Sequence, residues 1–266
     1  MDNAITILGA RGSVPVSGPA FSRYGGATTC IFVKLAGQLL VLDAGTGIMN
    51  LPEEALSVSE LPLILTHAHL DHLIGLPMCP YLFRRELHMM VFSQPRAGLT
   101  GKEFLDRLLS PPFWPVKLEA LPAKVSFHPL LQTFQLGDVL VETISGIHPD
   151  GVSLIRLTGG GKRIVLATDC TLTPEQSSSL ARFAQDCDLL LCDGQYSQEE
   201  WEFRKSFGHS TWIDAAKFGL TCRAKQIRIL HHDPSHTDAL LDAALPSLLS
   251  IHPQWSFARE MEKIVL

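Results

Sequence analysis

The segment Thr66-His67-Ala68-His69-Leu70-Asp71-His72 places four imidazole or carboxylate side chains within six positions, directly after the apolar segment Leu61-Pro62-Leu63-Ile64-Leu65. The apolar segment is short and rich in Leu and Ile, which favours a buried strand over a helix. A solvated loop is the alternative reading, but apolar residues flank the cluster on both sides, where unpaired ionisable groups are costly. The segment therefore predicts metal ligands at the end of a buried strand.

The spacing within this segment predicts two pairs of ligands. Residues two apart on a strand share a face, so His67 and His69 point the same way. The glycine and proline in Leu73-Ile74-Gly75-Leu76-Pro77 require a turn. That turn swings Asp71 and His72 toward a neighbouring point. The pattern differs from the His-Glu-x-x-His zinc motif, whose ligands need helical spacing.

Strand-like and helix-like segments alternate along most of the chain. The expected strands are Ile5–Leu8, Cys30–Leu35, Leu39–Leu42, Leu61–Leu65, Leu87–Phe92, several within Val125–Ser145, Leu154–Leu157, Ile164–Ala167, Leu189–Cys192 and Gln226–Leu230. The expected helices are Lys102–Leu109, Pro174–Asp186 with Thr173 as its N-cap, a helix that follows Gly208-His209-Ser210-Thr211, and Ala239–Leu249 with Asp238 as its cap.

Several aspartates and histidines stand where these strands stop. They are Asp43, the His67–His72 segment, His148, Asp169, Asp193 and His231. If the strands share one edge of a sheet sandwich, side chains far apart in sequence meet at one rim. The glycine-rich loop after Asp43 lacks the Gly-Lys-Ser/Thr of a P-loop, and no Gly-x-Gly-x-x-Gly is present, which argues against nucleotide binding of those two kinds.

Composition limits the partners and the compartment. The chain has 266 residues, of which 46% are apolar and 18% charged, against a typical charged share of about 25%, so we expect one large core and a single domain over residues 1–266. The net charge of −5 argues against a long nucleic acid as partner. Six scattered cysteines predict reduced thiols and a cytoplasmic protein. No signal peptide and no membrane-spanning segment is indicated.

The order of these residues resembles the metallo-β-lactamase superfamily. The His-x-His-x-Asp-His core corresponds to His67, His69, Asp71 and His72, with Asp43 before it and His148, Asp169 and His231 after it. The segments Gly9–Pro15, Asp43–Gly47 and Gly75–Pro77 look like the phosphodiesterase branch, which contains ribonuclease Z and cyclic phosphodiesterases. The block from Gly208-His209-Ser210-Thr211 to His231 resembles the extra histidine motif of that branch.

The resemblance implies an α/β (α+β) fold, a four-layer αββα sandwich, with two divalent metal ions. One metal would be held by His67, His69 and His148, and the other by Asp71, His72 and His231, with Asp169 bridging both. Asp43 would orient a ligand histidine. The adjacent His232 leaves the last ligand open. We prefer His231 because it directly follows a strand and consecutive strand residues point in opposite directions.

The ligand set suits Zn²⁺ best and would also accept Mn²⁺ or Fe²⁺. Two such ions about 3.5–4 Å apart can hold a bridging hydroxide that attacks a phosphodiester, with Asp71 accepting the proton of the water. His209 would act as general acid or as a donor to the phosphate oxygens. The expected substrate is a small phosphodiester, such as a cyclic nucleotide, because no Lys/Arg-rich insertion resembles the tRNA-binding arm of ribonuclease Z. Alternatives are a tRNA 3′-processing endonuclease, a carboxylic ester, thioester or lactone hydrolase, and a protein that binds metal without catalysis. The sequence leaves a homodimer open.

Overall fold

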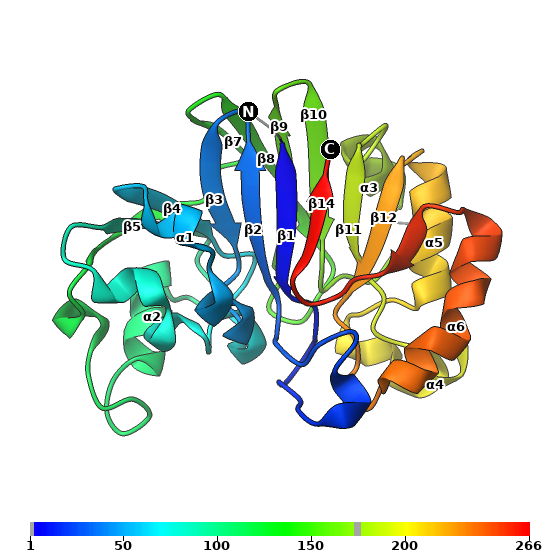
Figure 1. The fold of residues 1–266 in the computed structure, drawn as a ribbon, viewed down its shortest axis with the longest axis horizontal. Helices are drawn as coiled ribbons and strands as arrows, with labels where there is room; N and C mark the ends of the chain where they lie inside the picture. Colours follow the sequence, from blue (N-terminus) through cyan, green and yellow to red (C-terminus); the bar gives the residue numbers. More distant parts are fainter. Residues whose placement is uncertain (1–2, 173–176) are drawn as a thin grey trace.

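The computed structural model describes residues 3–172 and 177–266, which form two stacked β-sheets with helices on the two outer faces (Figure 1). Helices α1 (Glu53–Leu56) and α2 (Gly101–Leu108) cover one sheet. The other sheet is covered by α3 (Ser177–Phe183), α4 (Gln198–Arg204), α5 (Trp212–Thr221) and α6 (Asp238–Ile251). This arrangement confirms the predicted αββα sandwich.

Both sheets have seven strands. In spatial order the first sheet contains β14 (Glu262–Val265), β1 (Ala4–Gly9), β2 (Cys30–Leu35), β3 (Gln38–Leu42), β4 (Glu60–Ile64), β5 (His88–Ser93) and β6 (Lys124–Pro129). The second contains β13 (Trp255–Phe257), β12 (Gln226–Leu230), β11 (Leu189–Asp193), β10 (Lys162–Ala167), β9 (Val152–Gly159), β8 (Val139–Gly146) and β7 (Thr133–Leu136).

Each sheet has a parallel part that determines where the polar strand ends lie. Strands β3 to β6 pair in parallel in the first sheet, and β10 to β13 pair in parallel in the second. The carboxyl ends of parallel strands meet at one edge of a sheet, where the loops that follow them are close together. The remaining strands pair antiparallel.

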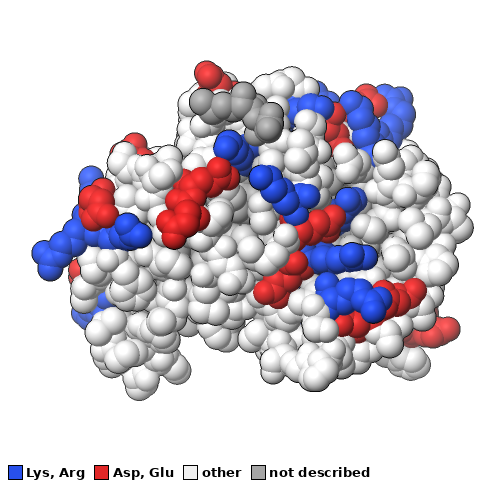
Figure 2. Space-filling model, in the orientation of Figure 1, with Lys and Arg blue, Asp and Glu red and all other residues white. Residues whose placement is uncertain are grey.

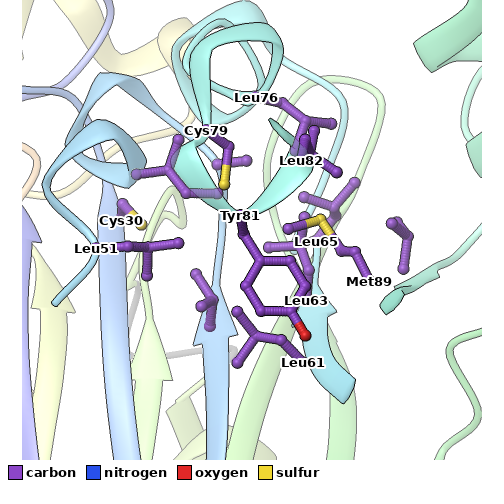
Figure 3. Close-up of a cluster of buried hydrophobic side chains, with 14 of the residues drawn as sticks. Cys30, Leu51, Leu61, Leu63, Leu65, Leu76, Cys79, Tyr81, Leu82 and Met89 are labelled. Carbon is purple, nitrogen blue, oxygen red and sulfur yellow. The ribbon is translucent and has the colours of Figure 1, made fainter. Parts of the chain in front are cut away.

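Three apolar clusters hold the layers together. One lies between the sheets, one between the first sheet and α1 and α2, and one between the second sheet and its helices. Figure 3 shows part of the cluster between the first sheet and helices α1 and α2, where the ring of Tyr81 lies among leucines such as Leu61 and Leu63. The Tyr81 hydroxyl donates to the carbonyl of Val58 at 3.0 Å, which satisfies the polar end of an otherwise buried side chain.

Seven short 3-10 segments occur in the loops of the described residues. They are η1 (Pro19–Phe21), η2 (Thr46–Asn50), η3 (Leu70–His72), η4 (Leu76–Met78), η5 (Pro80–Phe83), η6 (Leu118–Ala120) and η7 (Lys205–Phe207). Segment η3 contains Asp71 and His72, and η4 realises the turn that Gly75 and Pro77 predict. None of the described helices combines the length and apolar character needed to cross a bilayer.

The expected strands are present with ends shifted by only a few residues, but two helix predictions need comment. Helix α6 is capped by Thr237, whose hydroxyl accepts from the amide of Leu240 at 3.4 Å. Asp238 was predicted as the cap, but it is the first helical residue, and its carboxylate accepts from the amides of Arg23 and Tyr24 instead. The predicted start of α3, with Thr173 as its N-cap, lies outside the described residues.

Helix α4 was not predicted, although its sequence carries a start signal. Ser197 and Glu200 form a capping box, in which each side chain accepts from the backbone amide of the other residue. The helix is only seven residues long and has no buried residue, so no apolar period marks it. The assignment of residues 1–266 to one domain stays a prediction.

Replacing Leu191 by alanine should destabilise the protein by about 2–5 kcal/mol, because its side chain is fully buried between the sheets on β11 and its loss leaves a cavity. Urea unfolding followed by circular dichroism measures the change. The matched control is Leu220→Ala on α5, where the leucine is 53% exposed and the expected change is within about 0.5 kcal/mol. Equal effects of the two substitutions would contradict the assigned core.

Candidate metal centre

The polar strand ends meet at one rim of the sandwich. Asp43 directly follows β3, Asp169 lies two residues beyond the end of β10, and His231 directly follows β12. All three have positive φ values, of 60°, 52° and 62°. Such backbone angles are sparsely populated by residues other than glycine and persist where the surrounding structure imposes them. At each of these strand ends the chain turns sharply, and the side chain at the turn is directed into the shared rim.

The first group of candidate ligands consists of His67, His69 and His148, whose ligand atoms lie within 4.8 Å of one another. His148 donates from Nδ1 to the carbonyl of Gly208 at 3.1 Å, so its Nε2 carries no proton when the ring is neutral. That Nε2 lies 2.9 Å from Nδ1 of His69. Nε2 of His67 is buried without a hydrogen-bond partner. The three rings thus present lone pairs to one point.

The second group consists of Asp71, His72, Asp169 and His231, all of which are buried. Nε2 of His231 lies 2.9 Å from Oδ1 of Asp169 and 3.1 Å from Oδ2 of Asp71. Nε2 of His72 lies 3.2 Å from Oδ2 of Asp169. Oδ1 of Asp169 is also 3.8 Å from Nε2 of His67, so this carboxylate lies between the two groups.

The electrostatics of the two groups differ. Burial lowers the pKa of His67 well below its ordinary value and that of His148 to about 4, which keeps both rings neutral. Burial opposes charge on His72 and His231 as well, but Asp169 and Asp71 outweigh it, raising the pKa of His72 well above normal and that of His231 to about 10. The carboxylates therefore create a strongly negative potential that favours a cation between these rings.

The donor set fits two divalent metal ions. Nε2 of His67 and Nε2 of His72 are buried and lack hydrogen-bond partners, and a metal ion would satisfy both. Five imidazoles and two carboxylates, with no thiolate, are borderline ligands that suit Zn²⁺, Mn²⁺ or Fe²⁺. Every residue predicted as a ligand is in one of the two groups, and Asp169 has the position expected of a bridging carboxylate.

Asp43 lies behind the ligands and orients them. Its Oδ2 accepts from Nδ1 of His72 at 2.8 Å, which directs Nε2 of that ring toward the centre. Its Oδ1 accepts from the amide of Thr66 at 2.8 Å. The hydroxyl of Thr66 lies 2.8 Å from Asp43 and 3.0 Å from Nδ1 of His67, so one buried carboxylate supports a histidine of each group.

The structure distinguishes His231 from its neighbour His232. His231 presents Nε2 to the two carboxylates, whereas His232 donates from Nε2 to the carbonyl of Ala258 at 2.9 Å. The ring of His231 packs against Gly12, where a β-carbon would lie 2.2 Å from Nδ1 of the histidine. Glycine at position 12 therefore allows the ring to reach the centre. The sequence indicated only a tight loop at this position and did not predict the contact with His231.

His209 lies beside both ligand groups. Its ring stacks on His231 with centroids 4.6 Å apart and meets the edge of His148 at 4.9 Å. Nδ1 of His209 lies 2.7 Å from Oδ2 of Asp193, and Oδ1 of Asp193 accepts from the amide of Ser210 at 3.0 Å. Asp193 was noted in the sequence as a strand-end residue without a role. Its pairing with His209 joins segments 16 residues apart.

Two further residues that sequence reasoning passed over hold the loops of the centre. The buried guanidinium of Arg11 donates to the carbonyls of Gly25, Asp233 and His236, which ties three loops together. The amide of Ser13 donates to Oδ2 of Asp71 at 2.8 Å. Both lie in the Gly9–Pro15 segment, whose glycines and proline indicated only a tight loop.

Comparison with known proteins identifies the family. The model of the beta-lactamase superfamily domain matches residues 40–232, which is more than half of the chain. The chain belongs to this superfamily. Ribonuclease Z of Treponema pallidum is 22% identical over 304 aligned positions, covering 96% of this chain and 94% of the relative. This agrees with the predicted phosphodiesterase branch.

Solved structures share the fold over nearly the full length. The metallo-beta-lactamase fold protein YhfI from Bacillus subtilis superposes with a TM-score of 0.75 at 16% identity and full coverage of both chains. A diphosphatase from the PhnP family superposes with a TM-score of 0.70 at 17% identity, covering 100% of this chain and 98% of the other. These matches show the metallo-β-lactamase fold, and the family model together with the ribonuclease Z relatives identifies a metal-dependent hydrolase.

Replacing His231 by alanine should lower the metal content by about one ion per chain, because the second ligand group loses one of its imidazoles. His232→Gln should leave the metal content unchanged, since that ring faces Ala258 and glutamine can still donate. Elemental analysis of the purified proteins measures both. Metal loss in the His232 variant, with normal content in the His231 variant, would reverse the assignment.

Proposed function

We propose that this protein hydrolyses a small phosphodiester on two divalent metal ions, with Zn²⁺ as the best fit to the ligands and Mn²⁺ or Fe²⁺ as alternatives. The observation that carries the proposal is the Asp193–His209 pair stacked against His231. A phosphodiester that breaks at an alkoxide leaving group needs a proton donor, and this pair supplies one beside the metal ligands. The family membership and the curated ribonuclease Z relatives support the same class of reaction.

The metal ions would supply an acidified water as nucleophile and neutralise the charge of the phosphate. We assign His67, His69 and His148 to one ion, Asp71, His72 and His231 to the other, and Asp169 to both. Asp71 has a second role as acceptor of the proton that the attacking water releases. Its position between the candidate ligand rings supports this role, because its Oδ2 lies 3.1 Å from Nε2 of His231 and 3.4 Å from Nε2 of His72. Asp43 keeps the ligand rings oriented during turnover.

His209 would donate the proton to the leaving alkoxide. Its Nδ1 is held by Asp193, so Nε2 is the nitrogen that can pass a proton on. The Asp193 carboxylate also fixes the orientation of the ring. Two backbone amides, those of Ser210 and Gln195, fix the carboxylate, so the pair is preorganised.

A small substrate is supported by the cations around the centre. Four cationic residues in or next to the loops that carry the candidate ligands and His209 make contacts within the protein. Arg11 and Arg96 donate to carbonyl or hydroxyl groups, Arg204 pairs with Asp233, and Lys205 pairs with Glu202. On the face drawn in Figure 2, cations are interspersed with acidic side chains. Such a surface offers little to a polyanion.

The alternative with the most specific support is tRNA 3′-processing, because the curated relatives carry the name ribonuclease Z. It requires cleavage of precursor tRNA with strongly salt-dependent binding. Hydrolysis of a carboxylic ester, thioester or lactone on the same metals is the second alternative. The Asp193–His209 pair argues against a thioester, since a thiolate leaves without a general acid. An ester or lactone also releases an alkoxide, and here the ribonuclease Z relatives favour the phosphodiester.

The metal-loaded protein should hydrolyse bis-(p-nitrophenyl) phosphate and 2′,3′-cyclic AMP, and a chelator should abolish both activities. His209→Ala should lower kcat for the cyclic nucleotide by about 10²–10⁴-fold. The loss should be much smaller for bis-(p-nitrophenyl) phosphate, because p-nitrophenolate leaves without protonation. Steady-state kinetics and metal analysis of wild type and variant measure these effects.

The controls separate catalysis from structure. The His209 variant should keep its full metal content, and Asp193→Asn should show the same dependence on the leaving group with a smaller loss. An equal loss on both substrates would exclude general-acid catalysis by His209. Intact phosphodiesters alongside cleavage of a thioester or lactone would overturn the proposed function.

A further inference from the structure

Two aromatic side chains just before His209 are exposed to solvent. Phe203 on α4 is 90% exposed, and Phe207 at the end of η7 is 55% exposed. They are four residues apart, at the junction of two consecutive helical segments. Exposed phenylalanines contribute little to folding, and their grouping beside a catalytic centre indicates a surface for an apolar ligand.

The exposure of these rings does not result from a loose helix. The carboxylate of Glu200 lies 2.9 Å from Nε2 of the buried His236, and Arg204 lies 2.8 Å from Asp233. Nε1 of Trp201 donates to the carbonyl of His209 at 3.2 Å. Three contacts thus anchor α4 to the loop after β12 and to the residue that we assign as the general acid. Phe203 takes part in none of them.

Gly208 connects the aromatic pair to the metal centre. It has a φ of 83°, and a β-carbon there would lie 2.5 Å from Pro149 and 2.7 Å from Nδ1 of His148. Its carbonyl accepts from the same nitrogen of His148 at 3.1 Å. The backbone next to Phe207 is therefore packed directly against a candidate metal ligand, which brings this part of the chain close to the centre.

We propose that Phe203 and Phe207 form a stacking site for an aromatic ring of the substrate, which identifies the substrate class as nucleoside phosphodiesters with a single phosphate. This inference rests on the proposed function. Stacking on a phenyl face accepts any nucleobase, because every base has a π-face. The two cations beside the pair are engaged elsewhere: Arg204 pairs with Asp233 and lies over Tyr196, and Lys205 pairs with Glu202 and lies over Trp201. Neither of these two cations is therefore available to a second phosphate.

The test compares two five-membered cyclic phosphates of equal charge, 2′,3′-cyclic AMP and glycerol 1,2-cyclic phosphate. The ratio of their kcat/KM values measures recognition of the base. Phe207→Ala and Phe203→Ala should each reduce this ratio, by about tenfold for the stronger of the two, and Phe207→Trp should preserve it. Phe113→Ala is the matched control, because Phe113 is 78% exposed and lies in a different loop. Ratios that stay at the wild-type value in both alanine variants would overturn the proposal.

Binding to the zinc-loaded protein gives a second readout that does not depend on turnover. In saturation-transfer NMR with 3′-AMP, the adenine protons should receive saturation in the wild type and lose most of it in the Phe203→Ala/Phe207→Ala double variant. Equal transfer in wild type and double variant would contradict the stacking site. If the wild type cleaves neither cyclic phosphate, the proposed phosphodiesterase function fails, while this measurement still decides whether the aromatic pair binds a nucleobase.

Discussion

The buried carboxylate of Asp169 lies between two groups of histidines, and the surrounding structure depends on balancing its charge. One oxygen faces His231 and His67, and the other faces His72 and receives the hydroxyl of Thr168 at 2.6 Å. A buried carboxylate is costly unless cations or hydrogen bonds compensate it. The imidazoles alone can compensate the charge only by taking up protons. Two metal ions would compensate the carboxylates of Asp169 and Asp71 and would also satisfy the unpaired ring nitrogens. The parallel strand ends bring these groups together from both sheets.

The loops of the centre are held by close packing as well as by charge. Gly12 lets the ring of His231 approach the first loop, and Arg11, one residue earlier, joins three loops through carbonyl groups. Asp43 and Thr66 connect a histidine of each group from behind. Because His67, His72 and His148 are each oriented by a second contact, these candidate ligands are preorganised for metal ions. The positive φ values at three strand ends are maintained by this network.

Catalysis and substrate choice are assigned to one short stretch of the chain. His209 and its partner Asp193 face the ligands, while Phe203 and Phe207 face solvent from the segment directly before His209. Trp201 links the two through its hydrogen bond to the carbonyl of His209. An aromatic ring stacked on this segment would therefore be positioned relative to the general acid. In the proposed arrangement, specificity lies in α4 and η7, apart from the candidate metal ligands.

The sequence by itself determined the strands, the candidate ligand residues and the superfamily, because apolar segments and clustered histidines are local patterns. The His67–His72 segment and the strand-end residues Asp43, His148, Asp169 and His231 could be read without coordinates. Only the tertiary structure distinguished His231 from His232, since both follow the same strand and differ in what they face. The tertiary structure also showed that Asp193 pairs with His209, that Arg11 links loops, and that Phe203 and Phe207 are exposed to solvent. These depend on contacts between segments distant in sequence, on which periodicity and motif spacing carry no information.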